Sequence, residues 1–365
     1  MTPSPNRRTA KSLGRRSCKP PPSNSNSTAL PTGSAVLVAP SASKEQASAS
    51  STATEHTAAT KSKTSTSAKA TSTSGSGSSS GGGGALSLDA LFPMGTPGKS
   101  WTTSPKDESA LPLSDGTLNP TSIITALTHT YMAAPDGKYA MRAIYPEGSW
   151  TPSNNPRGGI SFYAPGSDDL DMTTAKELTF GYSVFFEKGF QFNKGGKLPG
   201  IYGGDDAETA ISCSGGRRAT NCYSARLMWR TDGAGELYTY LPDSAVKGFA
   251  ANKAVCDIPP LSECNPTYGA SVGRGSFKFP TGEWITVAQR VRLNDVGQAN
   301  GEIELWANGQ SVVSAKGLIL RDSDAGRHRG IQMQTFFGGS TSDWASPQTQ
   351  DTYFSDFSVA ITEPL

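Results

Sequence analysis

All aromatic residues of this 365-residue chain lie after position 84. The segment 1–84 contains no Phe, Trp or Tyr, whereas 14 Phe, 11 Tyr and 6 Trp occur in 85–365. A segment without aromatic side chains buries too little apolar surface to offset the entropy lost when it becomes ordered. We therefore predict a disordered tail over 1–84 and one folded domain over 85–365. A single core is feasible at this length, because a chain of about 300 residues buries about three quarters of its unfolded surface.

The predicted tail also has a biased composition. Ser and Thr make up 33 of its 84 residues, and its net charge of +8 contrasts with −6 for the rest of the chain. Basic tails occur in proteins that bind nucleic acid, but here the charges are scattered and no aromatic side chain is available to stack on bases. We interpret the tail as a solvated linker and expect no nucleic-acid partner. We expect no membrane partner either, because the chain lacks a run of about 18 apolar residues.

Four of the five cysteines form two close pairs, Cys213 with Cys222 and Cys256 with Cys264. Each pair brackets a segment rich in turn-forming residues, and a disulfide there would close a loop of roughly ten residues, worth at most about 2–3 kcal/mol. A zinc site is the alternative interpretation, but the tight Cys-x-x-Cys or Cys/His spacing that zinc requires is missing. We therefore predict two disulfides.

Three features favour an oxidising compartment: the predicted disulfides, the Ser/Thr-rich tail and the glycosylation sequon Asn26-Ser27-Thr28. Met1–Pro22 is basic but lacks the apolar segment of a normal secretory signal. Cys18 is left over in the tail. We expect an extracellular protein, secreted or associated with the cell wall, although no clear signal peptide is visible.

Helical periodicity is scarce after Gly84, and the best helix candidate is Ser122–Met132. Most other apolar segments alternate with period two between turn-forming residues, and Asn308-Gly309 is the strongest hairpin signal. This pattern predicts an all-β fold, a β-sandwich or jelly roll. The expected strands are Leu178–Glu187, Ala225–Trp229, Glu236–Leu241, Trp284–Leu293, Gly301–Ala307, Gly330–Phe337 and Thr352–Thr362.

Two groups of carboxylates are candidate sites. Asp168-Asp169-Leu170-Asp171 has the oxygen ligands that calcium prefers, but such a cluster is more often a solvated loop. Glu302 and Glu304 are two residues apart on a predicted strand and share one face, and glycosidases use paired carboxylates. We favour the simpler interpretation, an outer strand on which Ile303 and Leu305 point inward.

Histidine is too rare to supply a His-rich metal site or a Ser-His-Asp triad, since the chain has only His56, His129 and His328, and the first lies in the tail. We therefore expect no metal and no cofactor. His328 is flanked by Arg327 and Arg329, and we expect it in a surface loop.

The most informative region runs from Lys197 to Tyr240. A lysine stands beside a rigid Pro-Gly turn, and two alternating segments follow it. In a strand, alternate side chains point to the same face, so Tyr238 and Tyr240 share one face. Four side chains of the preceding segment likewise share a face. That set is Ser224, Arg226, Met228 and Arg230. No acidic residue occurs among these four, so the surface suits an anionic ligand.

These motifs resemble the fourteenth family of polysaccharide lyases, the alginate and glucuronan lyases of algal viruses, molluscs and fungi. The resemblance spans roughly Leu91–Ile361, and the cysteine pairs look like elaborations of the fungal type. It implies a jelly-roll (concanavalin-like) β-sandwich. The matching segments are Lys197-Leu198-Pro199-Gly200, Ser224-x-Arg226-x-Met228-x-Arg230, Tyr238-x-Tyr240 and Gly330–Gly339. The family's functional Lys, Ser, Arg and two Tyr correspond to Lys197, Ser224, Arg226, Tyr238 and Tyr240.

The chemistry of these side chains fits β-elimination of a 4-linked uronate, which needs a neutralised C6 carboxylate, a base for the C5 proton and an acid for the departing O4. Arg226 suits the first task, because a guanidinium grips a carboxylate bidentately and stays charged. We predict Lys197 and Tyr238 as the proton-transfer pair. Both have ordinary pKa values near 10, so nearby cations must lower the pKa of the base. The residues leave open which of the two is the base.

Other polar side chains are expected to bind or position the substrate. These are Ser224, Tyr240 and Arg230, together with Gln332 and Gln334, which share one face of a later strand. We also expect a local basic patch, formed by Lys197, Arg226 and Arg230 with Lys194, within an acidic domain.

We expect the sheet register to bring the tyrosines onto the arginine face. Arg226 and Tyr240 share a face only if the connecting loop has three or five residues, or a bulge. Closing the hairpin at Thr231 and Gly235 leaves three loop residues. Arg226 would then lie opposite Tyr240, and Met228 opposite Tyr238.

The predicted function is metal-independent β-elimination of a polyuronate by a monomeric extracellular lyase. Two alternatives remain open: a carbohydrate-binding module of the same fold without catalysis, and a glycosidase that uses Glu302 and Glu304.

Overall fold

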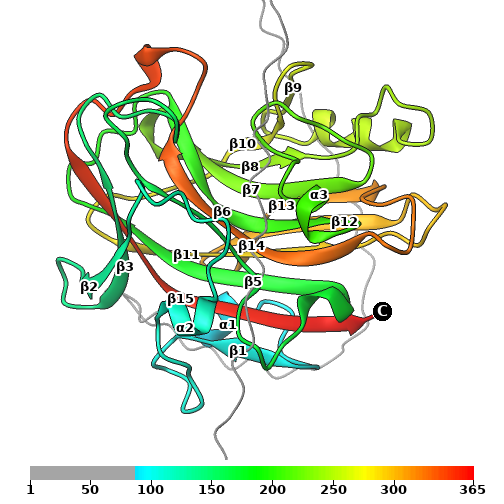
Figure 1. Ribbon diagram of the computed structural model, residues 1–365, viewed down its shortest axis with the longest axis horizontal. Helices are drawn as coiled ribbons and strands as arrows, with labels where there is room; N and C mark the ends of the chain where they lie inside the picture. The colour runs from blue at the N-terminus through cyan, green and yellow to red at the C-terminus, as the bar shows by residue number, and fades with distance from the viewer. Residues whose placement is uncertain (1–86) are drawn as a thin grey trace, which may run out of the picture. The chain divides into compact units, whose positions relative to one another are not determined.

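The structure, a computed structural model, describes residues 87–365. The predicted tail, with Cys18 and the glycosylation sequon, lies outside the described residues. Strands are the main regular structure of the described part, and they form two antiparallel sheets that pack as a jelly-roll sandwich (Figure 1). The all-β prediction is therefore confirmed for this part of the chain. None of its helices is long and apolar enough to cross a membrane.

The two sheets differ in size, and each is ordered so that strands distant in sequence lie side by side. The eight-stranded sheet has the order β13 (Gln310–Leu318), β12 (Gly301–Ala307), β11 (Trp284–Arg292), β5 (Ala175–Phe186), β15 (Gln350–Pro364), β3 (Tyr139–Tyr145) and β2 (Thr130–Ala133), with β1 (Ser100–Thr102) also paired to β15. The seven-stranded sheet has the order β4 (Ile160–Ala164), β14 (Arg327–Phe337), β6 (Gly195–Gly204), β7 (Cys222–Arg230), β8 (Ala234–Tyr240), β10 (Ala270–Lys278) and β9 (Glu263–Cys264).

Aromatic side chains from both sheets fill the space between them. Trp229 of the seven-stranded sheet packs edge-on against Phe186 of the eight-stranded sheet, with ring centroids 5.6 Å apart, and against Phe337 at 5.2 Å. Its indole N–H donates to the carbonyl of Phe192 at 3.1 Å, so the buried polar group is satisfied. This core explains why the aromatic residues are confined to the second part of the chain.

Helices are short in the described residues. The α-helices are α1 (Leu88–Leu91), α2 (Asp115–Leu118) and α3 (Ala207–Ala210), and the 3-10 helices are η1 (Met172–Thr174), η2 (Thr231–Gly233), η3 (Ala250–Asp257) and η4 (Ser342–Trp344).

The predicted helix over Ser122–Met132 is wrong. The segment follows the edge of β4 instead, where Thr121 pairs with Tyr163 and the Ile124 N–H donates to the Ser161 carbonyl at 3.0 Å. Its end becomes β2. The segment is rich in Ile and Thr, whose branched side chains disfavour the helix, and the sheet edge supplies hydrogen bonds that a local pattern does not reveal.

Two other local predictions are confirmed. Asn308 and Gly309 join β12 to β13 with φ angles of 50° and 80°, as a tight hairpin turn requires. Both disulfides are present, Cys213–Cys222 and Cys256–Cys264.

The expected surface position of His328 is wrong. His328 lies on β14 and is fully buried, with its Nδ1 2.5 Å from the Tyr223 hydroxyl. Burial lowers the pKa of His328 to about 4, so the ring is neutral.

Candidate active site

The candidate site lies on the outer face of the seven-stranded sheet. Alternation along β7 sends Ala225, Leu227 and Trp229 into the core between the sheets. It sends Met228 to the opposite face, where this side chain packs with Tyr238, Tyr240 and the Cys213–Cys222 disulfide. The two sets belong to separate apolar clusters, as the period-two pattern predicts.

The hairpin of β7 and β8 has the predicted loop length but a different register. Its three-residue connection, Thr231–Gly233, begins one residue earlier than expected. Arg226 therefore lies opposite Tyr238, and Ser224 opposite Tyr240, a shift of two residues from the predicted pairing. Because a shift of two keeps every side chain on its face, the tyrosines still share the face of Arg226.

Lys197 reaches the same face because of a bulge in β6. Lys197 pairs with Met228, but the next pair on that face is Gly200 with Arg226, so Pro199 is an extra residue in the ladder. Proline lacks the N–H that a ladder hydrogen bond needs, which makes it suited to a bulge. A Cβ on Gly200 would lie 2.1 Å from the Ala225 carbonyl oxygen, so only glycine fits there.

Arg226 is held by amide side chains rather than by a carboxylate. It is 1% exposed, and its Nη1 donates to Gln334 Oε1 at 2.9 Å, across strand β6. Gln334 Oε1 also accepts from Gln332 Nε2 at 2.9 Å, while Gln334 Nε2 donates to the Ser161 hydroxyl at 3.0 Å. Among the described residues, Arg226 forms no ion pair, and its Nε has no hydrogen-bond partner.

A buried guanidinium without a counter-ion is a costly arrangement, and burial lowers the pKa of Arg226. An arginine keeps its charge even so, because its ordinary pKa is above 12. The uncompensated charge therefore marks a place where an anionic ligand group would be strongly favoured.

Lys197 lies beside this arginine and is also nearly buried. Its Nζ is 2.7 Å from Met228 Sδ and 3.6 Å from the centroid of the Tyr238 ring. Burial, together with the charges of Arg226 and Arg230, holds the pKa of Lys197 well below its ordinary value. Glu236 opposes this shift but does not cancel it. A lysine in such surroundings is available as a neutral amine.

The pKa of Tyr238 moves in the opposite direction. Burial and the neighbouring Tyr240 raise it above the ordinary tyrosine value, so the hydroxyl keeps its proton. The two rings meet edge to face with centroids 5.7 Å apart. Two titratable groups with ordinary pKa values near 10 are thus pushed apart, which is the pattern of an acid and base pair.

Arg230 is engaged with a buried carboxylate that our sequence analysis missed. Glu236 is fully buried and accepts from Arg230 Nε at 2.8 Å, from Arg274 Nε at 2.9 Å and from the Ser271 hydroxyl at 2.6 Å. The parity of β8 places Glu236 on the face of Tyr238, so the pattern contained this signal. Arg274 belongs to β10, and no motif indicated its proximity.

These residues surround a cleft of about 640 Å³. The charged lining residues are Lys197, Arg226, Arg230, Arg274 and Glu263. The aromatic lining residues are Tyr238, Tyr240, Tyr268, Phe336 and Trp344. Arg230 and Arg274 are paired with Glu236, so the basic patch expected within an acidic domain is centred on Arg226, with Lys197 beside it. An aromatic wall beside a basic floor suits a sugar polymer that carries carboxylates.

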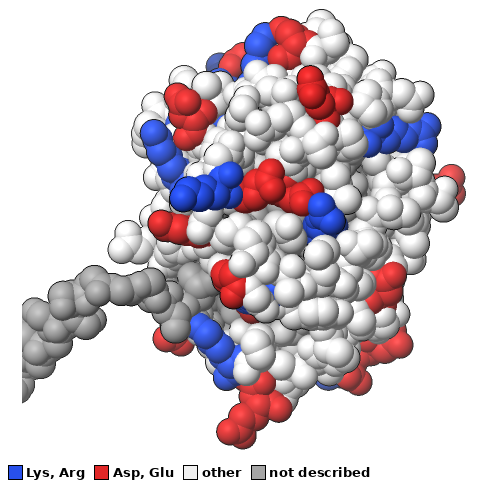
Figure 2. Space-filling view, turned by 90° about the vertical axis from the view of Figure 1, so that its left-hand side faces the viewer, with Lys and Arg blue, Asp and Glu red and all other residues white. Residues whose placement is uncertain are grey.

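Some predicted residues lie outside the cleft lining. Lys194 pairs with Asp343 on the surface and does not contribute to the patch. The Ser224 hydroxyl donates to the Cys213 carbonyl at 2.7 Å. Gln332 and Gln334 lie behind Arg226. On the face shown in Figure 2, basic and acidic side chains are interspersed, so it carries no patch of one sign.

The alternative carboxylate sites lie elsewhere. Glu302 and Glu304 face Arg290 on the outer side of the eight-stranded sheet, as the outer-strand interpretation expects. Asp171 caps η1 through a 2.9 Å hydrogen bond from the Thr173 N–H. The described residues contain no group of three or more His, Cys, Asp or Glu side chains placed to hold a metal ion.

A jelly-roll sandwich with a basic, aromatic-lined cleft on one sheet defines a carbohydrate-active class of proteins. The sequence profile of the polysaccharide lyase 14 family matches residues 133–357, and the chain belongs to that family. No curated protein sequence gives a significant match.

Two solved structures share this fold. The PL-14 alginate lyase of Aplysia kurodai is 34% identical with a TM-score of 0.56, covering 64% of this chain and 87% of its own. The alginate lyase vAL-1 of a Chlorella virus is 27% identical with a TM-score of 0.55, covering 67% of this chain and 93% of its own.

Proposed function

We propose that this lyase cleaves a 4-linked polyuronate by β-elimination in the cleft above β7 and β8. The observation that carries the proposal is Arg226, a buried guanidinium without a carboxylate partner among the described residues. A uronate carboxylate is the partner that this charge lacks. Pairing there would neutralise the carboxylate and make the C5 proton of the sugar acidic.

Lys197 is proposed as the base and Tyr238 as the acid. The depressed pKa of Lys197 leaves a neutral amine that takes the C5 proton, while the raised pKa of Tyr238 keeps a phenol that donates to O4. The C5–H electron pair becomes the C4=C5 double bond, and the C4–O4 bond breaks. The departing O4 receives the proton of Tyr238, so protons and electrons balance.

The remaining predicted residues are proposed to hold this arrangement. Gln334 and Gln332 orient the guanidinium of Arg226, and Ser224 and Tyr240 connect the strands to the loop that follows α3. Arg230 is tied to Glu236 and lies 5.7 Å from the Tyr238 ring centroid, where its charge acts on the neighbouring proton-transfer groups.

Alginate is the first substrate to test, because two solved structures similar to this chain are alginate lyases. The protein is incubated with alginate, glucuronan and a neutral glucan, and ultraviolet absorbance is followed. Elimination creates a conjugated double bond and raises the absorbance, whereas hydrolysis by a glycosidase gives reducing ends without it. A binding module gives neither. No absorbance change on any polyuronate would overturn the proposed function.

The proton-transfer roles have their own test within the same assay. Lys197→Met and Tyr238→Phe should each lower kcat by about 100-fold or more, because each removes one proton-transfer group. Tyr202→Phe is the matched control, since Tyr202 lies on the same sheet face but does not line the cleft. A chelator should leave activity unchanged, because Arg226 performs the neutralisation that a cation would otherwise supply.

We further propose that the enzyme works outside the cell as a monomer. Two disulfides in one domain are typical of an oxidising compartment. A polymer substrate also has to be met where it is deposited. Detection of activity in the cell fraction alone, or a stable dimer in size-exclusion chromatography, would contradict these two expectations respectively.

A further inference from the structure

The Cys213–Cys222 disulfide packs against the candidate site and not against the main core. Both cysteines are buried, and their cluster consists of Met228, Tyr238 and Tyr240. The loop that this disulfide closes, Cys213–Cys222, leads from α3 into β7, and its Gly215 lines the cleft. The cross-link is therefore adjacent to the groups that the proposed reaction uses.

Two direct hydrogen bonds connect this loop to the sheet. The Ser224 hydroxyl donates to the Cys213 carbonyl at 2.7 Å, and the Gly216 N–H donates to the Tyr240 hydroxyl at 3.3 Å. The loop backbone thus fixes the side chains of two residues that the family resemblance marks as functional.

A third connection runs from the segment before the loop to Arg226. The Tyr163 hydroxyl donates to the Ile211 carbonyl at 3.1 Å and accepts from Gln332 Nε2 at 3.1 Å. Gln332 Nε2 also donates to Gln334 Oε1, which accepts from Arg226. The donors and acceptors in this chain of hydrogen bonds are mutually compatible. A displacement of Ile211 would therefore also displace the guanidinium of Arg226.

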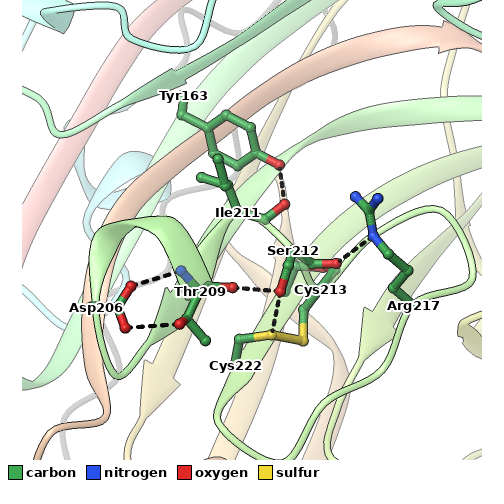
Figure 3. The surroundings of a disulfide bond; sticks show 9 residues. Tyr163, Asp206, Thr209, Ile211, Ser212, Cys213, Arg217 and Cys222 are labelled. Carbon is green, nitrogen blue, oxygen red and sulfur yellow. Dashed lines mark hydrogen bonds between the residues drawn. A yellow bond between two sulfur atoms is a disulfide. The ribbon is translucent and has the colours of Figure 1, made fainter. Parts of the chain in front are cut away.

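The loop is braced at its base, as Figure 3 shows. Asp206 accepts from the Thr209 N–H at 2.8 Å, and the Ser212 hydroxyl donates to the Thr209 carbonyl at 2.7 Å. Arg217 Nε donates to the Ser212 carbonyl at 3.0 Å. Arg218 reaches the carbonyls of Asn265 and Tyr268 on the other side of the cleft.

We propose that the Cys213–Cys222 loop is a positioning element for the proposed reaction, which holds Arg226 and Tyr240 in place only while the disulfide is closed. The inference rests on the proposed function. Opening the disulfide frees the loop backbone, and the Ile211 and Gly216 anchors lose their fixed positions. The side chains of Arg226 and Tyr240 are then displaced relative to the bound sugar. A displacement of about 1 Å costs about 100-fold in rate.

A positioning role has a signature that a purely stabilising role lacks. The charge of Arg226 helps to hold down the pKa of Lys197. When Arg226 is less closely held, that pKa rises, and the acid limb of kcat/KM moves to higher pH. Lower stability alone would reduce the amount of folded enzyme without moving this limb.

The test compares three variants: C213S/C222S, C256S/C264S and Tyr163→Phe. The second disulfide closes a loop of similar length, with a sequence separation of 8 against 9, and is the matched control for stability. Tyr163→Phe breaks the chain of hydrogen bonds from Ile211 to Arg226 while both disulfides stay intact. Circular dichroism and thermal unfolding establish folding, and kcat, KM and the pH profile are measured on alginate.

We expect C213S/C222S to lose about tenfold to 100-fold in kcat, with the acid limb at higher pH. C256S/C264S should lose stability but retain most of its kcat. Tyr163→Phe should show a smaller kcat loss and the same direction of pH shift with near wild-type stability, which keeps the test decisive if C213S/C222S does not fold.

The outcomes separate the two proposals. An active wild type whose kcat and pH profile are matched by C213S/C222S, or by Tyr163→Phe where the double variant is unfolded, overturns the positioning role alone. A wild type that is inactive on every polyuronate overturns the proposed function, and the positioning role falls with it.

Discussion

Arg226 on β7 and Arg290 on β11 each lie on the outer face of a different sheet, but their surroundings are opposite. Arg290 meets three carboxylates, with Nη1 3.0 Å from Glu177 Oε2 and Nη2 within ion-pair distance of Glu302 and Glu304. Within residues 87–365, Arg226 donates a side-chain hydrogen bond only to the amide oxygen of Gln334. Both side chains are largely removed from water.

This difference indicates that the number of charges on a surface is a poor guide to a binding site. On the eight-stranded sheet, the charge of Arg290 is compensated by three carboxylates of the same sheet. On the seven-stranded sheet, Arg226 has no carboxylate partner among the described residues. A buried charge without a partner costs stability, and a ligand that supplies the partner recovers it.

The largest expected effect comes from exchanging each arginine for lysine. Arg226→Lys should lower kcat/KM by about 100- to 1000-fold, because an ammonium cannot grip a carboxylate bidentately and loses its proton easily when buried. Arg290→Lys should leave kcat/KM unchanged. Equal activity losses in the two variants would remove the functional distinction between the two faces.

The second expected effect is on stability, and here the larger loss is expected at Arg290 and not at Arg226. Arg290→Met should lower the free energy of unfolding by about 2–4 kcal/mol, because Glu177, Glu302 and Glu304 would face one another without a cation. Arg226→Met should cost little or even stabilise the protein, since it removes an uncompensated buried charge. Urea unfolding of both variants measures this directly. A larger loss for Arg226→Met would contradict the comparison.

The third expected effect is a pH dependence of kcat/KM and of stability that is caused by Lys197 in the cleft. The pKa of Lys197 lies well below 10.5, so kcat/KM should fall about tenfold per unit as the pH drops through that lowered value. The unfolded chain binds a proton on Lys197 more tightly than the folded one. This residue therefore makes stability rise with pH between the two pKa values. Subtracting the stability profile of Lys197→Met from that of the wild type isolates this rise, and identical profiles would contradict it.

The smallest effect is that of salt. Raising the ionic strength from about 0.1 M to 1 M shortens the screening length from about 10 Å to about 3 Å. The KM for a polyuronate should rise several-fold through weaker capture by Arg226, whereas kcat should change little. A neutral salt series with kcat and KM determined at each point is sufficient. A salt-independent KM would argue against electrostatic capture.

Period two, together with an odd number of residues in the connecting loop, was sufficient to predict which side chains of β7 and β8 share a face. It placed Arg226, Tyr238 and Tyr240 together correctly even though the register is shifted by two residues. The register itself depends on where the chain turns, and here Asp232 and Gly233 adopt positive φ angles of 57° and 73°. Several positions in this loop suit such a turn. The sequence pattern therefore does not decide between registers that differ by two residues, because these keep every side chain on the same face.

Predictions failed where the deciding contact is distant in sequence. The Ser122–Met132 segment turns at Ile124–Leu127 and hydrogen-bonds to β4, and His328 is buried in contact with Tyr223. Arg274 reaches Glu236 from a strand nearly 40 positions later, with a separation of 38. The disulfides were accessible to prediction, because each links cysteines that are close in the sequence.

The bulge at Pro199 makes the irregular pairing of β6, and not only its residue types, a condition for the proposed chemistry. Lys197 and Gly200 are three positions apart but project to the same face. Regular pairing of β6 at unchanged length would put these two residues on opposite faces, turning Lys197 toward the apolar core and bringing Leu198 into the cleft. A related chain that keeps the length of β6 but pairs it without the bulge would therefore contain every side chain of the cleft in its sequence and still present no lysine to the sugar.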